Sequence, residues 1–526
     1  MPLATVVALA LGGNHIPVLI DQGVGVAAWN SLTTTFLSSF GAIVAGLVAA
    51  VVLDRTDVAG TRVLRMFVLS PLLIPPFVGA IAWLQLFGPN QGVNGWFDSP
   101  VWDIYGGDGV TFLMTVHSYP IAYLIISTAL RSIPGDLELA ARISGARAPT
   151  VITTVTLPLL SPAILSAFTL TAVSNLADFG IPSLLGSPRG FETLATMMYR
   201  FINTGTVDNP LQVTATIGVL LIILGVAAVV ADHVMSARRP AAMQDTGSLS
   251  LIELGAARWP VTFAAWLLTL LITVAPILGL AYRALLPAPG VPLTWETMTL
   301  DNFTRALTNP RAVDGFTNSV VLSLGAAFLC GIIGLVAGVL ITRTRHWSNG
   351  ALTLLFLLPT ALPGLLIGVG WLISGRYLGV YNSRWVILAA YVCAFTALVL
   401  QAVRAPLAQT PASVEEAARI SGAGPLRALV DTTGRMAVPA AISGAVLVAV
   451  TAVRELTISV LLVAPGMTTL GVQVFNLQQA GNYNQASALS LLFAIVGIAS
   501  LALTLSRSSP TRHRSQPHSH QQHGKV

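Results

Sequence analysis

Three ionisable side chains interrupt apolar stretches of this sequence, and their chemistry needs an explanation before anything else. Asp178 lies in LADFGIPSLLG, and Arg454 and Glu455 are neighbours in VRELTISVLL. Ionisable groups in an apolar environment are costly, so they commonly line a polar path or pair with an opposite charge. We hold two interpretations of Asp178, Arg454 and Glu455: a translocation path or gate, and a structural ion pair in which Arg454 neutralises one of the acids.

The sequence lacks the residue patterns of common catalytic and metal sites. Lysine occurs only as Lys525, just before the final Val526, so the Gly-Lys-Ser/Thr of a nucleotide-binding phosphate loop is absent. No His-Glu-x-x-His or Cys-x-x-Cys motif occurs, and Cys330 and Cys393 lie in apolar runs, where we expect no disulfide. The histidines of 513–523 form a cluster of low specificity for metal. We expect no catalytic residue, metal or cofactor in this chain.

Two loops repeat a pattern that predicts a short docking helix. They read DLELAARISGARAPTVITTVTLPLL over 136–160 and SVEEAARISGAGPLRALVDTTGRMAVP over 413–439. Asp136 and Ser413 are good N-cap residues, and Ser413 with Glu416 would form a capping box. Paired alanines leave one helix face bare, so that a partner can approach closely. A single copy would suggest only an amphipathic helix at an interface, but two matched copies favour docking.

The ends of these helices are also predicted from sequence. Gly145 and Gly422 can adopt the left-handed conformation that ends a helix. Leu139 occupies the position of Glu416, with Glu138 one residue earlier, so we expect the second loop to be better ordered and Glu416 to matter more than Glu138. The residues that we expect to form the docking elements are Glu138, Ala140, Ala141, Gly145, Glu415, Glu416, Ala417, Ala418 and Gly422.

The elements that position these residues are apolar runs long enough to cross a bilayer. Hydrophobic residues make up 54% of the chain and charged residues only 9%, whereas soluble domains carry about 25% charged residues. About 20 apolar residues span a membrane as a helix, so we predict an all-α polytopic membrane protein with about 11–12 transmembrane helices. The expected spans are 32–53, 63–87, 111–130, 151–176, 212–231, 260–286, 319–341, 351–374, 385–403, 440–463 and 486–505.

The chain reads as a tandem duplication of a roughly six-helix domain. Asn30-Ser31 recurs as Asn318-Ser319, 288 positions later, and AARISGA at 140–146 recurs at 417–423, 277 positions later. Only the short apolar stretch 3–12 precedes the first copy, so we expect its N-terminal helix to be truncated. The expected domains are a first transmembrane domain (1–235), a linker (236–258), a second transmembrane domain (259–505) and a disordered tail (506–526).

The arginines predict the orientation. Most of the 27 lysine and arginine residues fall between alternate spans, whereas the loop 88–110 contains none. Because positive residues concentrate on the cytoplasmic side, we expect loops 131–150 and 404–439 to face the cytoplasm. The basic composition is therefore better explained by membrane topology than by nucleic-acid binding.

The two loops resemble the "EAA" loop of permeases of type I ABC importers, whose pattern is Glu-Ala-Ala, three residues, Gly, nine residues, Ile-x-Leu-Pro. In the second loop Glu416, Ala417, Ala418 and Gly422 match; in the first, Ala140, Ala141, Gly145 and Leu157-Pro158 match. The second loop departs from the pattern because Val438-Pro439 comes four residues late. The resemblance covers essentially the whole chain, and the segments around Asp178 and Glu455 look like those of iron(III)-type members.

The resemblance implies partners and a function. It implies a pore-forming subunit in a bacterial inner or plasma membrane. Two separate ABC ATPase subunits would receive the loops and use the ATP, and an extracytoplasmic binding protein would deliver a small solute. Ferric iron is the best guess for the solute, with thiamine, phosphonate or polyamine as alternatives. An ion-driven secondary transporter is the alternative class; it would leave the paired loops unexplained. An intramembrane enzyme ranks last.

The orientation gives a first prediction. A cysteine introduced at Gly145 should be labelled by a membrane-impermeant thiol reagent only after the cells are opened, because the arginine-rich loops face the cytoplasm. A cysteine placed in the 88–110 loop is the control and should react on intact cells. Labelling at position 145 from outside would reverse the topology.

Overall fold

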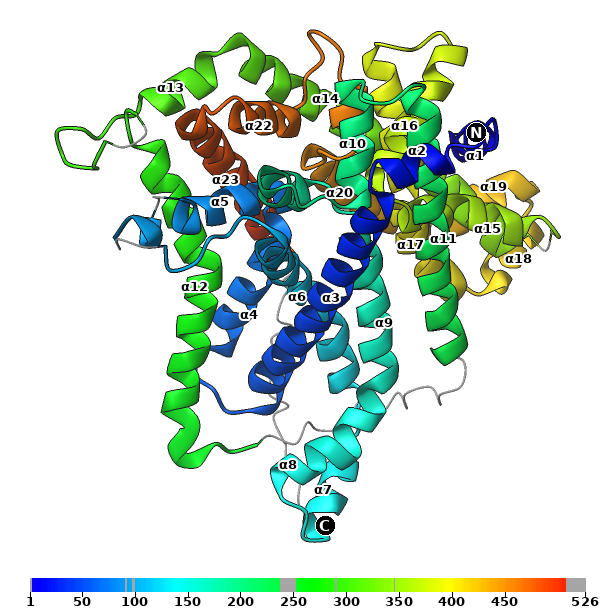
Figure 1. Cartoon of the computed structure of the whole chain (residues 1–526). Coiled ribbons are helices and arrows are strands. Elements are labelled where there is room, and N and C mark those ends of the chain that lie inside the picture. The colour runs from blue at the N-terminus through cyan, green and yellow to red at the C-terminus, as the bar shows by residue number, and fades with distance from the viewer. Residues whose placement is uncertain are drawn as a thin grey trace, which may run out of the picture.

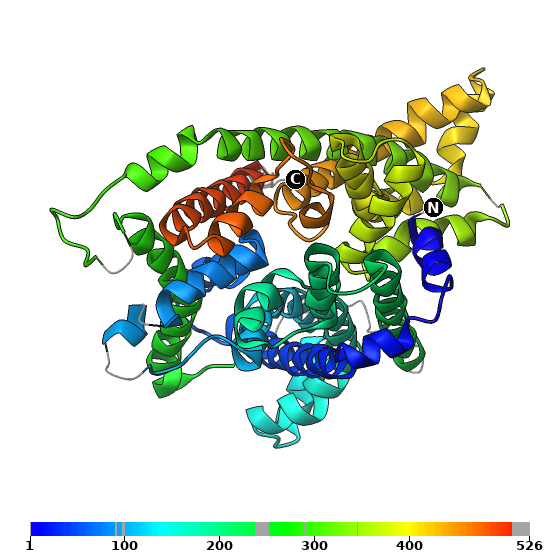
Figure 2. The same cartoon turned by 45° about the horizontal axis from the view of Figure 1, so that its top comes forward.

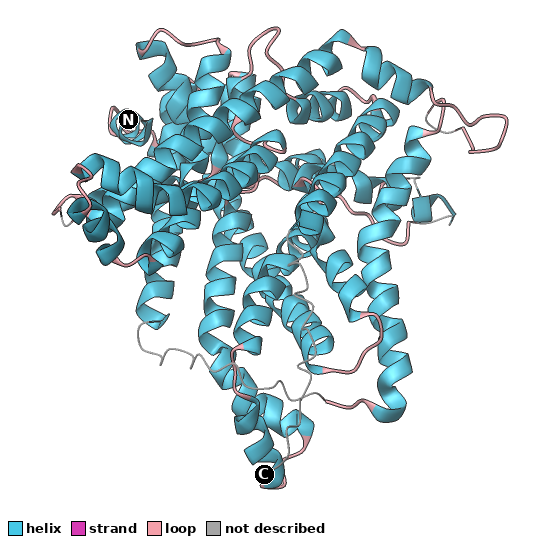
Figure 3. Ribbon diagram, turned by 180° about the vertical axis from the view of Figure 1, so that it is seen from behind, coloured by secondary structure: helices cyan, strands magenta, loops and turns pink. Residues whose placement is uncertain are grey.

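The computed structural model of the chain is built from helices (Figures 1 and 3). It describes residues 2–89, 92–96, 100–236, 252–288, 291–344 and 346–507. Within those ranges the only extended pairing is one parallel β-bridge between Thr56 and Ile252. The all-α class predicted from sequence is confirmed. Most of the expected linker and the whole histidine-containing tail from residue 508 onward lie outside the described residues.

The described residues of the first half of the chain, up to residue 236, form eleven α-helices and five shorter helical turns. They are α1 (Pro2–Ala10), α2 (Ile16–Asp21), α3 (Val24–Arg55), α4 (Thr61–Leu69), η1 (Ser70–Leu73), α5 (Pro76–Phe87), η2 (Gly92–Trp96), α6 (Gly107–Arg131), α7 (Gly135–Ile143), α8 (Ala148–Val151), η3 (Ile152–Thr156), α9 (Leu157–Leu176), η4 (Pro182–Gly186), η5 (Ser187–Arg189), α10 (Leu194–Thr204) and α11 (Pro210–Ser236).

The second half repeats this order. Its elements are η6 (Gly255–Ala257), α12 (Arg258–Ala284), α13 (Asp301–Thr308), α14 (Pro310–Arg343), α15 (Asn349–Leu357), η7 (Leu358–Ala361), α16 (Gly364–Tyr377), α17 (Arg384–Gln409), α18 (Ala412–Ile420), α19 (Pro425–Leu429), η8 (Val430–Gly434), α20 (Arg435–Val453), α21 (Ser459–Leu462), α22 (Leu470–Gln479) and α23 (Tyr483–Arg507).

The membrane-spanning helices agree with the spans predicted from the sequence, except for two breaks within spans and one span boundary. Among the described residues, 8 helices are long and apolar enough to cross a membrane, or up to 10 if each of two bent pairs is one span. The bent pairs correspond to the expected spans 63–87 and 351–374, and the chain turns by 105° and 110° within them. Prolines stand at both breaks, where they remove backbone donors and kink the helix. The helix α23 covers the last expected span.

The boundary that differs is the end of the span expected at 440–463. The helix α20 ends at Val453, so Arg454 and Glu455 follow the helix rather than lie inside it. In the same way α9 ends at Leu176, before Asp178. In each half the chain then enters a short helical segment, η4 after α9 and α21 after α20.

Each half is organised around one long helix that packs closely on its partner. The helix α3 packs along α6, and α14 packs along α17. A Cβ atom added at Gly46 of α3 would lie 2.7 Å from the backbone nitrogen of Tyr123. One added at Gly334 of α14, the repeat equivalent, would lie 2.7 Å from Cβ of Val399. Small residues therefore let the backbones approach, as is common between membrane helices.

The first helix of each half packs on the other half. The helix α12 contacts α4 and α5 of the first half as well as α23, and α1 contacts α16 of the second half as well as α11. Figure 2 shows α12, in green, on the side of the blue elements α4 and α5. The two halves are therefore intertwined, because the first helix of each half covers helices of the other.

The close approach at Gly46 gives a second prediction. Gly46→Ala should lower the free energy of unfolding by about 1–3 kcal/mol, because the added methyl meets backbone atoms that cannot move aside. The matched control is Gly25→Ala in the same helix, where an added Cβ has nothing within 4 Å. Thermal unfolding of both variants in lipid nanodiscs measures the effect. Equal melting temperatures for the two would contradict the packing.

Candidate functional site

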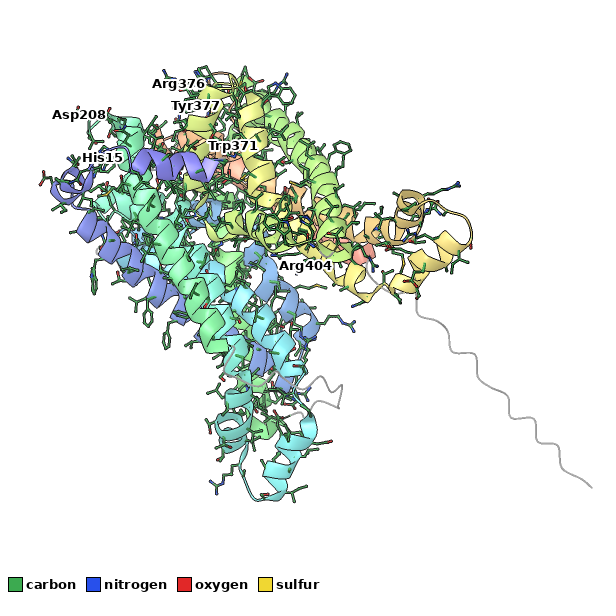
Figure 4. All side chains as sticks on the ribbon, turned by 90° about the vertical axis from the view of Figure 1, so that its right-hand side faces the viewer. His15, Asp208, Trp371, Arg376, Tyr377 and Arg404 are labelled. Atoms are coloured by element: carbon green, nitrogen blue, oxygen red, sulfur yellow. The ribbon has the colours of Figure 1, made fainter. Side chains whose placement is uncertain are left out.

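The two loops singled out by sequence project from the helical body. We call residues 135–156 (α7, α8 and η3) the first protruding loop and residues 412–434 (α18, α19 and η8) the second. The first projects from the lower end of the molecule and the second from the right-hand side (Figures 1 and 4). In this conformation they point in different directions, and their common cytoplasmic position stays a prediction from charge.

The predicted glycine-terminated helix ends are confirmed. Gly145 and Gly422 both have φ of 91°. After α7, the N–H of Ala146 donates to the carbonyl of Ala141 at 3.0 Å and the N–H of Gly145 to that of Arg142 at 2.9 Å. The same two bonds recur after α18. This pair of hydrogen bonds around a residue in the left-handed conformation is the Schellman motif, which only glycine enters without strain.

The predicted helix starts are wrong. The helix α7 begins at Gly135 after Pro134, and α18 begins at Ala412 after Pro411, without a side-chain capping bond in either. Proline fixes φ near the helical value and lacks an N–H, so it starts the helix without a capping side chain. Asp136 and Ser413 are thus inside the helices. The capping box with Glu416 is absent, and with it the physical reason for ranking Glu416 above Glu138.

The glutamate that the structure does use in the first loop is Glu138. Its Oε1 lies 3.2 Å from Nη2 of Arg55, at the end of α3, and the two side chains are only 7% and 3% exposed. The hydroxyl of Thr156, at the start of α9, donates to the same oxygen at 2.9 Å. One carboxylate therefore ties α7 to two membrane-spanning helices.

The second loop repeats this arrangement with Glu415, not Glu416. Its Oε1 lies 3.1 Å from Nε of Arg343, at the end of α14. The hydroxyl of Thr433 donates to the same oxygen. Arg343 lies 288 positions after Arg55, and Glu415 and Thr433 lie 277 positions after Glu138 and Thr156. We call each Arg–Glu–Thr set a clamp. Sequence reasoning missed the arginines and threonines, although the repeat shifts applied to single polar residues would have found them.

The outer faces of the loops are exposed in the part of the chain that the structure describes. Ile143 and Ile420 are repeat equivalents, and their side chains are 87% and 88% exposed. The predicted residues Glu416, Ala140 and Ala417 are also exposed, and so is Leu139, one turn before Ile143. Each loop therefore exposes a helix face of small side chains with a large apolar residue at its end. Neither isoleucine was among the residues singled out from sequence.

The three ionisable residues near the ends of α9 and α20 do not form the expected ion pair. The Asp178 carboxylate accepts the N–H of Ile181 at 3.0 Å. The Glu455 carboxylate accepts the N–H groups of Ile458 and Ser459 at 2.6 and 3.0 Å. Each acid therefore caps the short helical segment that follows it. Within the described residues no salt bridge joins Arg454 to either acid.

Arg454 has a different partner. Its guanidinium donates to the backbone carbonyl of Leu72, in η1 of the first half. The bond satisfies a carbonyl that the break between α4 and α5 leaves without a helical donor. It also joins the end of α20 to the first half, so that Arg454 connects the two halves. Among the described residues, no group of three or more His, Cys, Asp or Glu side chains is placed to hold a metal ion.

Comparison with known proteins agrees with the duplicated helical fold. The chain matches the family described as "binding-protein-dependent transport system inner membrane component" over residues 23–240 and 331–509. A probable ABC transporter permease protein of Sinorhizobium fredii is 26% identical over 425 residues, covering 77% of this chain and 74% of the relative. Each matched region contains one protruding loop.

Two further relatives carry substrate names. The ferric transport system permease protein FbpB of Actinobacillus pleuropneumoniae is 22% identical over 485 residues, covering 88% of this chain and 69% of the relative. The molybdenum transport system permease protein ModB of Mycobacterium bovis is 31% identical over 202 residues, covering 38% of this chain and 76% of the relative. With two matching regions across most of its length, the chain belongs to the family of binding-protein-dependent transport system inner membrane components.

Proposed function

We propose that this chain supplies both halves of the pore of an ATP-driven importer, with a separate ATPase subunit docking at each protruding loop. An extracytoplasmic binding protein delivers the solute, and the ATP is used by the partner subunits. The observation that carries the proposal is the pair of matched loops, each with an exposed isoleucine and a clamp at its base, buried in the first loop and partly buried in the second. The membrane of a bacterial cell is the expected location.

The outer face of each loop has the chemistry of a docking surface. Small side chains allow a partner backbone to approach, and a largely exposed isoleucine supplies an apolar anchor. Ile143 and Ile420 occupy the same place in both loops. An interfacial helix without a partner would turn its apolar side toward the protein or the lipid, whereas here the apolar tip points away from the helical body.

The base of each loop has the chemistry of a coupling element. The Glu138 carboxylate joins α7 to both α3 and α9, and Glu415 joins α18 to α14 and to the start of α20. A bond between oppositely charged groups away from water is stronger than the same bond in water. Displacement of a docked loop would therefore be passed to membrane-spanning helices on both sides of it.

The residues first considered for the translocation path receive a supporting role. Asp178, Arg454 and Glu455 hold the chain where α9, α20 and the α4–α5 pair are broken. Non-helical backbone at membrane depth is tolerated where it lines a cavity or is buried in protein. We propose that these residues fix the broken segments near the path and do not bind the solute directly.

Ferric iron is the solute that we propose, since a ferric permease matches 88% of this chain. The phosphonate, thiamine and polyamine alternatives remain open, and the molybdenum permease among the relatives shows how far solutes vary within the family. Cells that express the chain with its ATPase and binding protein should accumulate radiolabelled iron, and excess unlabelled ferric citrate should compete. Competition by molybdate or an aminophosphonate, with none by iron, would replace the proposed solute.

The docking role gives a further prediction. The double variant Gly145→Pro with Gly422→Pro should insert into the membrane but fail to co-purify with the ATPase, because proline cannot adopt the φ of 91°. Ile143→Asp with Ile420→Asp, which leaves the backbone alone, should lose co-purification as well. The matched control for backbone strain is Gly466→Pro, because Gly466 has φ of 78° and lies away from both loops. Normal co-purification of both double variants would refute the docking role.

A further inference from the structure

A buried aspartate gathers three donors directly beside the first clamp. Oδ1 of Asp54 lies 2.8 Å from Nη2 of Arg65 and 2.7 Å from Nη2 of Arg131, and the Asp54 side chain is 1% exposed. The hydroxyl of Ser127 donates to Oδ2 at 2.6 Å. We call these four residues the Asp54 cluster. It joins the end of α3 to α4 and to the end of α6.

The Asp54 cluster and the first clamp share one turn of helix. Arg55, the next residue, donates to the carbonyl of Leu130 at 3.0 Å and pairs with Glu138 of α7. Two consecutive residues of α3 therefore make three bonds to α6 and one to α7. The short segment between α6 and α7 is fixed at both of its ends.

The segment that leads into the second half is hydrogen-bonded to the end of α3 and the residues that follow it. The N–H of Ile252 donates to the carbonyl of Arg55 at 2.7 Å, which forms the β-bridge beside Thr56. The N–H of Leu254 donates to Oδ1 of Asp57 at 3.1 Å, and Nε of Arg258 donates to the carbonyl of Asp57 at 2.9 Å. We call residues 252–258 the strap. It leads directly into α12.

The strap also reaches the clamp itself. The side chain of Ile252 borders a small cavity together with Arg55, Glu138 and Thr156. The strap therefore lies beside the first clamp.

Among the described residues, the second half has a clamp but no buried carboxylate that corresponds to Asp54. Its clamp glutamate is more exposed than that of the first half, 21% against 7% for the side chains. Arg404, labelled in Figure 4 near the base of the second protruding loop, is exposed. The residues at the positions of Asp54, Arg65, Ser127 and Arg131 are Thr342, Thr353, Arg404 and Ala408. Within the described residues no salt bridge forms at these four positions.

We propose that the two protruding loops are mechanically unequal. The first moves as one body with α3, α4, α6 and the start of α12, and Asp54 is the positioning residue that makes it rigid. The second is held by its clamp and by the bond from Arg343 to the carbonyl of Thr410 at 2.9 Å, without a buried carboxylate like that of Asp54 among the residues described there. This order is the reverse of the one expected from sequence. In the importer proposed above, and resting on that proposal, equal displacements of the two ATPase subunits would move the two halves of the pore by unequal amounts.

The identical sequences of the loops allow a direct test by hydrogen–deuterium exchange. AARISGA occurs at 140–146 and at 417–423, so intrinsic exchange rates match, while different flanking residues separate the peptides by mass. In the full-length chain in lipid nanodiscs, the amides of 141–146 should exchange at least about tenfold more slowly than those of 418–423, because local opening is costlier there. Equal rates would overturn the proposal.

Variants assign the difference to the cluster. Asp54→Asn should speed exchange of 141–146 toward the rate of 418–423 and leave the latter unchanged. Thr342→Ala, at the equivalent position, is the matched control and should change neither. Asp57→Ala, which removes one attachment of the strap, should give a smaller increase in the first loop and serves if Asp54→Asn does not insert. Unchanged exchange in a correctly inserted Asp54→Asn or Asp57→Ala protein would contradict the proposal.

This test is independent of the docking role. The nanodiscs contain no ATPase, so the exchange rates report only how firmly each loop is held by the chain itself. Loss of the docking role would show instead as normal co-purification of the glycine and isoleucine double variants. Each failure can thus be told from the other.

Discussion

The hydrocarbon interior of a membrane offers no water to backbone N–H and C=O groups, so any break in a spanning helix must be satisfied by the protein itself. This chain breaks at matched places in its two halves. At the α4–α5 and α15–α16 breaks, prolines remove donors that would otherwise be left unpaired. After α9 and α20, Asp178 and Glu455 accept backbone N–H groups of the next segment. Asp178 and Glu455 thus act mainly as hydrogen-bond acceptors for backbone N–H groups.

The need to satisfy backbone groups at a helix break also explains how the halves are joined. The carbonyl of Leu72 is exposed by a break in the first half and receives the guanidinium of Arg454 from the second. The exchange of α1 and α12 between halves adds packing to this bond. At the other end of the helices, the clamps tie each protruding loop to two spans. In each half the clamp therefore connects the protruding loop to spanning helices.

Much of the fold could be predicted because its signals are local or repeated. Apolar runs gave the spans, the two repeat shifts gave the duplication, and Gly145 and Gly422 gave the helix ends. The helix starts were wrong because Pro134 and Pro411 begin the helices without the expected caps.

The polar contacts could not be predicted from the same signals. Asp54 meets Arg131, 77 positions away, and Arg55 meets Glu138, 83 positions away, so no local pattern announces either pair. An ion pair of Arg454 with Asp178 or Glu455 was one of the two interpretations because the sequence does not reveal that the helix ends before each acid.

The energy source of transport tests the account most directly. The chain would be reconstituted into proteoliposomes with its ATPase and binding protein, and solute uptake would be followed with ATP or with an imposed proton or sodium gradient. The account predicts uptake that requires ATP and the ATPase and that persists when the gradients are collapsed. Uptake by the chain alone, driven by an ion gradient without ATP, would contradict it.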